Sequence, residues 1–184
     1  MYFAASLQNV TNKIVENQHV ITKVYFTRLI LPISGVLSGL VDFGILFVMF
    51  MAILVFYRIQ PSGAIVMLPI FLLLAVLTAL GVGLWLSALN ALYRDVRFVM
   101  PFLIQFWMFA SPVAYPSSLV PEKWRWLYGL NPMTGVIDGF RWSLTGSGDP
   151  PTTLLLASSV VVIAGLFGGL MYFQKTETTM ADVV

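Results

Sequence analysis

Residues 59–93 run IQPSGAIVMLPIFLLLAVLTALGVGLWLSALNALY and contain no charged side chain. These 35 residues exceed the roughly 20 that a helix needs to cross the hydrocarbon core of a bilayer. An unpaired charge at the bilayer centre costs about 2.5–3.5 kcal/mol, so a long charge-free interval marks a membrane span. We therefore expect a membrane-spanning helix at about 64–92.

Similar intervals lie on both sides of this stretch. Residues 98–121 and 150–174 carry no charge, and residues 29–57 carry only Asp42. They predict further spans at about 30–57, 98–115 and 153–173. The spans at 30–57 and 64–92 are close to 28 residues long, about 42 Å, so they must tilt or project beyond a core of about 30 Å. The predicted fold class is all-α, a polytopic membrane helix bundle with four complete transmembrane helices and short interfacial helices.

The composition excludes several other classes of protein. Only 10% of the 184 residues are charged, against about 25% in a typical globular domain, so the chain could not cover a water-facing surface. Disorder and nucleic-acid binding are excluded for the same reason. The chain has no cysteine and one histidine, and it lacks a GxxxxGK phosphate loop. We expect no enzyme activity, cofactor or metal site, and any ATPase must be a separate chain.

The basic residues predict the orientation. One set of span ends carries Lys13, Lys23, Arg28, Arg94, Arg97 and Lys175, and the other carries Arg58, Lys123, Arg125 and Arg141. Six against four favours a cytoplasmic N-terminal side. Residues 1–28 are then the end of a preceding span and a cytoplasmic segment, and 153–184 are the last span and a cytoplasmic tail. Apolar residues recur at helical spacing within 8–28, which fits a solvated connector or a docking helix for a partner.

The segment 116–152 is rich in proline and tryptophan and is expected to lie outside. It predicts two short amphipathic helices, one with Pro121 in its first turn and an end at Gly129, the other starting at Asn131 and Pro132 and ending near Gly146. In the second helix Asp138 can pair with Arg141 at i, i+3. The tryptophans of this loop, which are Trp124, Trp126 and Trp142, are either interfacial anchors or parts that close or shape an exit.

Three features inside the spans bear on function. Asp42 lies near the middle of its span, where a carboxylate is costly, and either a structural or a transport role explains it. An aromatic stripe follows the span at 98–115 and comprises Phe98, Phe102, Phe106, Phe109, Trp107 and Tyr115. Such a stripe either packs against helices and lipid or stacks on sugar rings. The pairs Gly35/Gly39 and Gly165/Gly169 are GxxxG motifs that permit close helix packing.

Five motifs in order give the chain a recognisable pattern. They are NQHVITKVYFTRLILP (17–32), VDF (41–43), ALNALYRDVR (88–97), FASPVAYP (109–116) and LNPMTGVIDGFR (130–141). Together they resemble the type-2 ABC exporter permeases of polysaccharides and polyol phosphates, the family of O-antigen, capsule and teichoic-acid exporters. Thr27 stands where that family usually has proline. The resemblance implies six spans in the family fold, of which this sequence would hold the third to the sixth.

The resemblance also implies partners and roles. It predicts two copies of an ABC ATPase subunit, a second permease copy and a lipid-linked glycan substrate, in a multi-pass protein of the bacterial inner membrane. It assigns ATPase coupling to Asn17, Lys23, Arg28, Tyr93, Arg94 and Asp95. It assigns the outer gate helices to Trp124, Trp126, Asn131, Pro132 and Arg141, and it favours Phe98, Phe102, Phe106, Phe109 and Tyr115 as the substrate path.

The predicted function is therefore the membrane subunit of an ATP-driven exporter of lipid-linked polysaccharide or polyol phosphate. Two alternatives stay open. One is a type-2 ABC permease for a drug or another small amphiphile, and the other is a membrane assembly factor that transports nothing.

Overall fold

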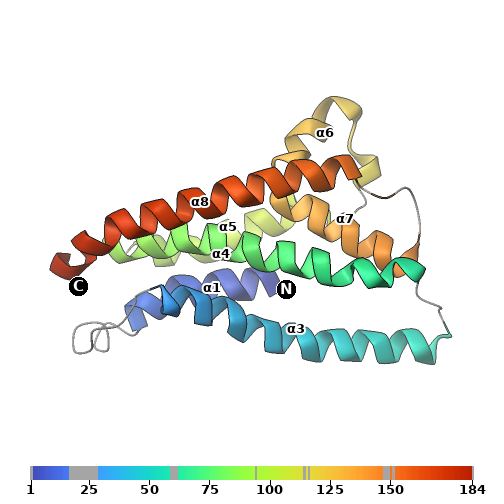
Figure 1. Cartoon of the computed structure of the whole chain (residues 1–184), viewed down its shortest axis with the longest axis horizontal. Coiled ribbons are helices and arrows are strands. Elements are labelled where there is room, and N and C mark those ends of the chain that lie inside the picture. The colour runs from blue at the N-terminus through green and yellow to red at the C-terminus, as the bar shows by residue number, and fades with distance from the viewer. Residues whose placement is uncertain are drawn as a thin grey trace.

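The computed structural model of the chain describes residues 2–16, 29–58, 62–93, 95–113, 115, 117–146, 150 and 152–183. The regular elements in these ranges are all helical (Figure 1). They are α1 (Tyr2–Glu16), α3 (Ile30–Phe56), the 3-10 helix η1 (Gly63–Met67), α4 (Leu68–Leu92), α5 (Val96–Ala110), the 3-10 helix η2 (Ser117–Leu119), α6 (Glu122–Gly129), α7 (Pro132–Thr145) and α8 (Thr152–Val183).

Three helical segments are long and apolar enough to cross a membrane: Ile30–Phe56, Gly63–Leu92 and Thr152–Thr176. They confirm the predicted polytopic helical bundle. The fourth predicted span, 98–115, is shorter than expected, because α5 has 15 residues and measures only about 22 Å. Ser111 turns to an extended backbone (φ −103°, ψ 146°) before Pro112, as a residue before proline prefers. Proline at 112 thus ends the helix although apolar residues continue.

Helix α1 lies in the interior and packs against α3 and α4 (Figure 1). Leu7 and Val10 are fully buried. A Cβ added to Gly35 or Gly83 would meet Val10 at 2.9 Å, so glycine lets both neighbouring helices approach α1. Residues 8–16 therefore continue α1, with Val10 and Thr11 buried, and do not start a separate surface segment at residue 8. The rest of the predicted cytoplasmic segment, 17–28, lies outside the described residues.

Helix α8 packs along α4 through small residues. A Cβ on Gly169 would meet the carbonyl oxygen of Gly81 at 2.7 Å. Trp85 covers this contact, since its Nε1 donates to the carbonyl of Gly165 at 3.1 Å and its ring stacks on Tyr172 with centroids 4.8 Å apart. In the first GxxxG motif a Cβ on Gly39 would meet Ser6 and Tyr2 of α1, whereas in the second the close packing lies at Gly169, since a Cβ on Gly165 would meet nothing.

Helix α7 begins and ends where the sequence predicts. Asn131 is its N-cap and accepts from the backbone N of Met133, Pro132 occupies the first turn, and Gly146 closes it at φ +64°. Helix α7 is more deeply buried than the predicted interfacial helix. A Cβ on Gly135 would meet Ser158 of α8 and one on Gly139 would meet the ring of Phe71 of α4. α6 starts at Glu122, so Pro121 is its N-cap and does not lie in its first turn as predicted.

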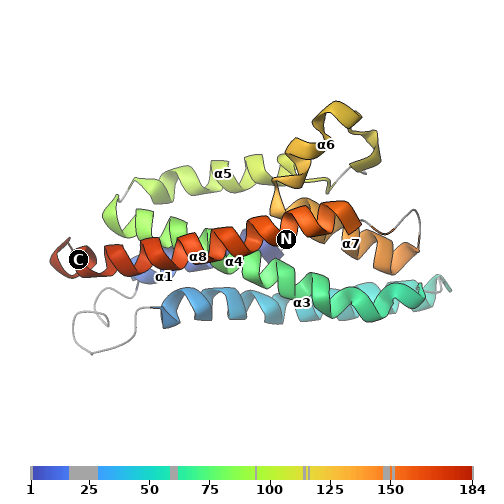
Figure 2. The ribbon, with the colours of Figure 1, turned by 45° about the horizontal axis from the view of Figure 1, so that its top comes forward.

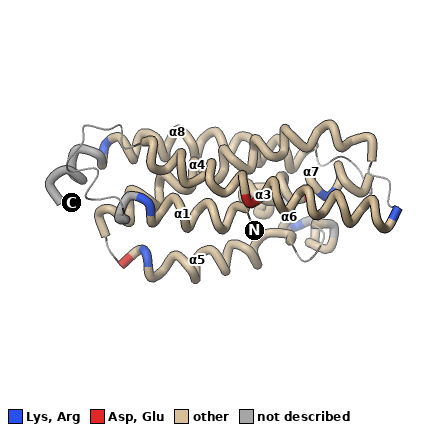
Figure 3. Tube along the Cα trace, turned by 90° about the horizontal axis from the view of Figure 1, so that it is seen from below, with Lys and Arg blue, Asp and Glu red and all other residues tan. Residues whose placement is uncertain are grey.

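Charged positions gather mainly at the ends of the bundle (Figure 3). One end holds the last turn of α1, the α4–α5 turn and the C-terminal part of α8, which carry Lys13, Asp95, Arg97 and Lys175. The opposite end holds Arg58 after α3 and the end of α7. The two predicted sets of basic residues therefore separate among the described positions. Which end is cytoplasmic stays a prediction, and we call the first one the inner end below.

Candidate functional site

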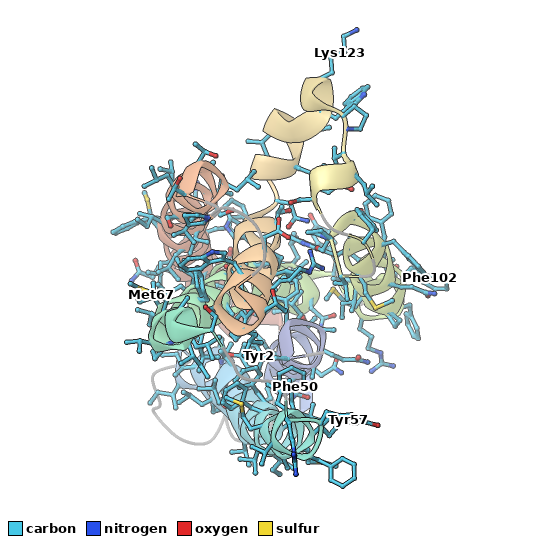
Figure 4. All side chains as sticks on the ribbon, turned by 90° about the vertical axis from the view of Figure 1, so that its right-hand side faces the viewer. Tyr2, Phe50, Tyr57, Met67, Phe102 and Lys123 are labelled. Atoms are coloured by element: carbon cyan, nitrogen blue, oxygen red, sulfur yellow. The ribbon has the colours of Figure 1, made fainter. Side chains whose placement is uncertain are left out.

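Four phenylalanines form one exposed surface of α5, which we call the aromatic face. Phe98, Phe102, Phe106 and Phe109 are 63%, 74%, 72% and 66% exposed. Phe102 points away from the other helices in the end-on view of Figure 4, and α5 stands apart from the bundle along much of its length in Figure 2. The guanidinium of Arg97 lies 4.9 Å from the ring centre of Phe98. Within the described chain, most of the surface of each of these rings is left uncovered by other helices.

Tyr115 lies beyond α5 and so is not part of the aromatic face. Its hydroxyl donates to the carbonyl of Phe109 at 3.1 Å and shares a hydrogen bond with the hydroxyl of Tyr128 in α6. The hydrogen bond with Tyr128 favours the protonated phenol and raises the pKa of Tyr115 to about 12. Tyr115 thus fastens the loop after α5 to α6.

Asn131 joins the end of α5 to the start of α7. Its Oδ1 accepts from the indole Nε1 of Trp107 at 3.1 Å, in addition to its cap bond. Its Nδ2 donates to the carbonyl of Ala110 at 3.2 Å and to Oγ of Ser111 at 3.0 Å. We call the set Trp107, Ala110, Ser111 and Asn131 the α5–α7 junction. The predicted gate residue Pro132, which follows Asn131 in the first turn of α7, is buried.

Arg141 ties the loop after α5 to α7 from the other side. Its Nη1 pairs with Oδ1 of Asp138 at 2.9 Å, as predicted, and its Nη2 donates to the carbonyls of Pro112 at 2.8 Å and Tyr115 at 3.5 Å. The second oxygen of Asp138 and Oγ1 of Thr134 are buried with no hydrogen-bond partner among the described residues.

An apolar cavity of about 610 Å³ opens between α4, α5, α8 and the start of α7. Phe106 and Trp107 line it from α5, and Gly81 and Gly165 line it from α4 and α8. Because Phe106 belongs both to this cavity and to the aromatic face, the two apolar surfaces are continuous.

A smaller groove of about 390 Å³ lies between α6 and the preceding loop. Tyr115, Pro121, Trp124 and Tyr128 line it, and Trp124 is 56% exposed. The side chain of Trp126 lies outside the described residues, and Trp142 is half-buried in α7. The predicted gate residues therefore divide into Trp124, which borders an open groove, and Asn131 and Arg141, which hold α5 and α7 together.

The inner end shows two of the six residues assigned to ATPase coupling. Tyr93 and Asp95 are exposed in the turn between α4 and α5, and the backbone N of Tyr93 donates to the carbonyl of Leu89 at 2.8 Å. The other four, which are Asn17, Lys23, Arg28 and Arg94, lie outside the described residues.

Asp42 lies near the middle of α3 and is exposed. None of the described residues donates a hydrogen bond to its carboxylate or forms an ion pair with it. Among the same residues, no group of three or more His, Asp or Glu side chains is placed to hold a metal ion.

Trp107, Ser111 and Tyr128 are site residues that the sequence analysis did not identify. Trp107 was grouped with the aromatic stripe, but its indole points to Asn131 and its ring packs edge-on against Phe3 with centroids 5.3 Å apart. The available signal was the break at Ser111–Pro112, because a helix that ends inside an apolar run leaves carbonyl groups that need donors.

The fold and these sites define a class: a polytopic helical membrane protein in which hydrogen bonds join the end of the short helix α5 to a buried helix α7. The ABC-2 type transporter family matches residues 1–145, and this chain belongs to that family. Family membership and the spans confirm a transport subunit and a multi-pass protein of the inner membrane.

Several curated proteins are similar over much of the chain. An O-antigen export system permease protein RfbA of Myxococcus xanthus is 24% identical over 186 residues, covering 100% of this chain and 72% of the relative. A protein of the same name from Klebsiella pneumoniae is 28% identical over 185 residues, covering 100% and 71%. The inner membrane transport permease YadH of Escherichia coli strain K12 is 28% identical over 142 residues, covering 74% and 55%. The chain thus spans between about half and three quarters of these relatives.

Proposed function

We propose that this chain is the membrane subunit of an ATP-driven exporter that moves lipid-linked polysaccharide or polyol phosphate across the bacterial inner membrane. The names of the two O-antigen export permeases support the substrate class. The observation that carries the proposal is the aromatic face, where Phe98, Phe102, Phe106 and Phe109 present uncharged rings along one side of α5. Such rings stack on the C–H faces of sugars of varied identity.

The same proposal assigns partners to the other exposed regions. Two copies of an ABC ATPase subunit bind the inner end, where Tyr93 and Asp95 are exposed. A second permease copy faces α5 and completes the path. The four exposed phenylalanines can form only one side of a path, so the opposite side must come from another chain. The groove at Trp124 lies at the proposed exit.

Replacing Phe102 and Phe106 by alanine together in the full-length protein tests the path. We expect glycan export to fall about tenfold at unchanged membrane abundance, because each ring contact contributes about 0.5–1.5 kcal/mol and about 1.4 kcal/mol corresponds to a factor of ten. Surface glycan per cell is the measurement. The matched control replaces Phe56 of α3 and Phe167 of α8, which are 82% and 63% exposed outside α5.

Normal surface glycan in the Phe102/Phe106 variant, or an equal loss in the Phe56/Phe167 control, contradicts an aromatic path. A permease for small amphiphiles is distinguished by a deletion strain that keeps its surface glycan and becomes sensitive to amphiphilic drugs. An assembly factor is distinguished by purification of the full-length protein without an ATPase subunit.

A further inference from the structure

Helix α5 and helix α7 are held by the structure in very different ways. Only Met100 of α5 is buried, and the aromatic face is exposed along the whole helix. Helix α7 packs into α4 and α8, with Gly139 against Phe71 and the backbone N of Gly135 donating to Oγ of Ser158 at 3.2 Å. A helix with little packing shifts as a unit more readily than one with interlocked side chains. Between the two, α5 is therefore the more readily displaced.

The side chain of Asn131 is the main link between them. Three of its four hydrogen bonds run to α5 or its end, namely to Trp107, Ala110 and Ser111, and the fourth caps α7. The inner end of α5 follows directly on the turn at 93–95. A displacement of that turn along α5 therefore reaches α7 first through the carboxamide of Asn131, and Arg141 links α7 only to the loop that follows α5.

Where α7 meets the loop after α5, two buried polar atoms lack a hydrogen-bond partner among the described residues. Thr134, Asp138 and Arg141 follow at i, i+4 and i+7, so they share the face of α7 that meets the loop after α5. Oγ1 of Thr134 and Oδ2 of Asp138 are buried without partners among the described residues. A buried polar group without a hydrogen-bond partner destabilises the arrangement that buries it, which lowers the free-energy difference to a second arrangement in which the loop and α7 separate.

We propose that Asn131 is a positioning residue that makes the outer helices α6 and α7 move with α5. A change at the inner turn then widens or narrows the outer groove bordered by Trp124. This inference rests on the proposed function, because it takes the ATPase to act at the inner end. It adds the residue through which that action reaches the exit.

Asn131→Asp in the full-length protein with its ATPase subunit isolates this role. Aspartate keeps the oxygen that caps α7 but removes the two N–H donors to Ala110 and Ser111. We expect ATP hydrolysis within about twofold of the unmodified complex and glycan export lower by about tenfold or more, since two hydrogen bonds contribute about 1 kcal/mol each. Trp107→Phe, which removes one of the three hydrogen bonds between Asn131 and α5 and keeps an aromatic ring, should lower the ratio of export to hydrolysis less.

Ser158→Ala is the matched control. It removes a buried hydrogen bond of the same helix, but one that runs to α8 and not to α5. We expect it to leave the ratio of export to hydrolysis unchanged. If Asn131→Asp leaves that ratio unchanged, or if Ser158→Ala lowers it equally, Asn131 has only a structural role and the proposal is overturned.

A second measurement does not depend on the substrate. These 184 residues contain no cysteine, and Lys123 lies exposed at the tip of α6 (Figure 4), so Lys123→Cys adds one labelling site to this part of the protein, and the complex without that substitution gives the background. Its rate of reaction with a water-soluble maleimide should differ between the nucleotide-free and the vanadate-trapped complex. Asn131→Asp should abolish that difference, and a difference that persists overturns the coupling role. The unmodified complex could show this difference in labelling rate and yet export no glycan. If Asn131→Asp then abolishes the difference, the proposed substrate is rejected and the coupling role of Asn131 stands.

Discussion

Helix α3 has 27 residues with Asp42 as its single charge, and it buries Pro32, Gly35, Val36 and Gly39. Helix α7 has 14 residues, carries both Asp138 and Arg141, and buries eight residues. The longer and more apolar helix is thus the less buried one. Beyond Gly39, the side chains of α3 are exposed or half-buried within the described chain.

The difference follows from the solvent of each surface. Lipid tails are as apolar as leucine, so burying an apolar side chain in a membrane protein gains little over leaving it in lipid. Packing in the membrane depends instead on small residues and on satisfied polar groups. Hydropathy therefore identifies α3 as a span, while glycine, serine and paired charges identify α7 as interior.

Removing the paired cation of α7 should have the largest effect on stability. Arg141→Ala leaves the buried carboxylate of Asp138 without its ion pair and the carbonyl of Pro112 without its donor. We expect a loss of about 2–3 kcal/mol in the free energy of unfolding. Arg58→Ala at the exposed end of α3 should change it by less than about 0.5 kcal/mol. Unfolding of the detergent-purified protein measures both. Equal losses would show that Arg141 is no more structural than a terminal arginine.

Adding one methyl group to each helix should have the next largest effect. Gly139→Ala pushes a Cβ into the ring of Phe71 and should cost about 2 kcal/mol. Gly44→Ala in α3 meets nothing within 4 Å and should stabilise by up to about 1 kcal/mol through helix propensity. Melting temperatures of the two variants should move in opposite directions. A destabilised Gly44→Ala would place a packed neighbour on that part of α3.

Neutralising the carboxylate of α3 should have the smallest effect. Asp42→Asn removes a charge that no described residue pairs, so we expect a change within about 0.5 kcal/mol in the same unfolding measurement. The corresponding change in α7, Asp138→Asn, removes the partner of Arg141 and should cost more. A loss above about 1 kcal/mol for Asp42→Asn would indicate a partner for Asp42 beyond the described residues.

The sequence predicted those parts of the fold that local chemistry decides. Charge-free intervals located α3, α4 and α8, and Asn131, Pro132 and Gly146 located both ends of α7. The pair Asp138–Arg141 was also predictable, since i, i+3 neighbours meet on any helix. These features depend on residues a few positions apart.

Other parts depend on contacts between distant residues and were not predictable. Residues 8–16 look amphipathic, but Val10 of that segment fits against glycine backbones of two later helices. The bond from Trp107 to Asn131 joins residues 24 positions apart, so the sequence alone placed Trp107 in the aromatic stripe. Tyr115 was grouped with the aromatic stripe of the predicted span 98–115, although α5 ends at Ala110.

The shortness of α5 has a consequence for the lipids around it. At about 22 Å this helix falls short of the roughly 30 Å hydrocarbon core, while α3 and α4 exceed it. Such hydrophobic mismatch is accommodated by thinning the bilayer beside the short element, at a cost of fractions of a kcal/mol per ångström. We therefore expect the bilayer to be thinner beside α5 than beside α3. Acyl-chain length thus becomes a property of the membrane that favours one position of α5 over another.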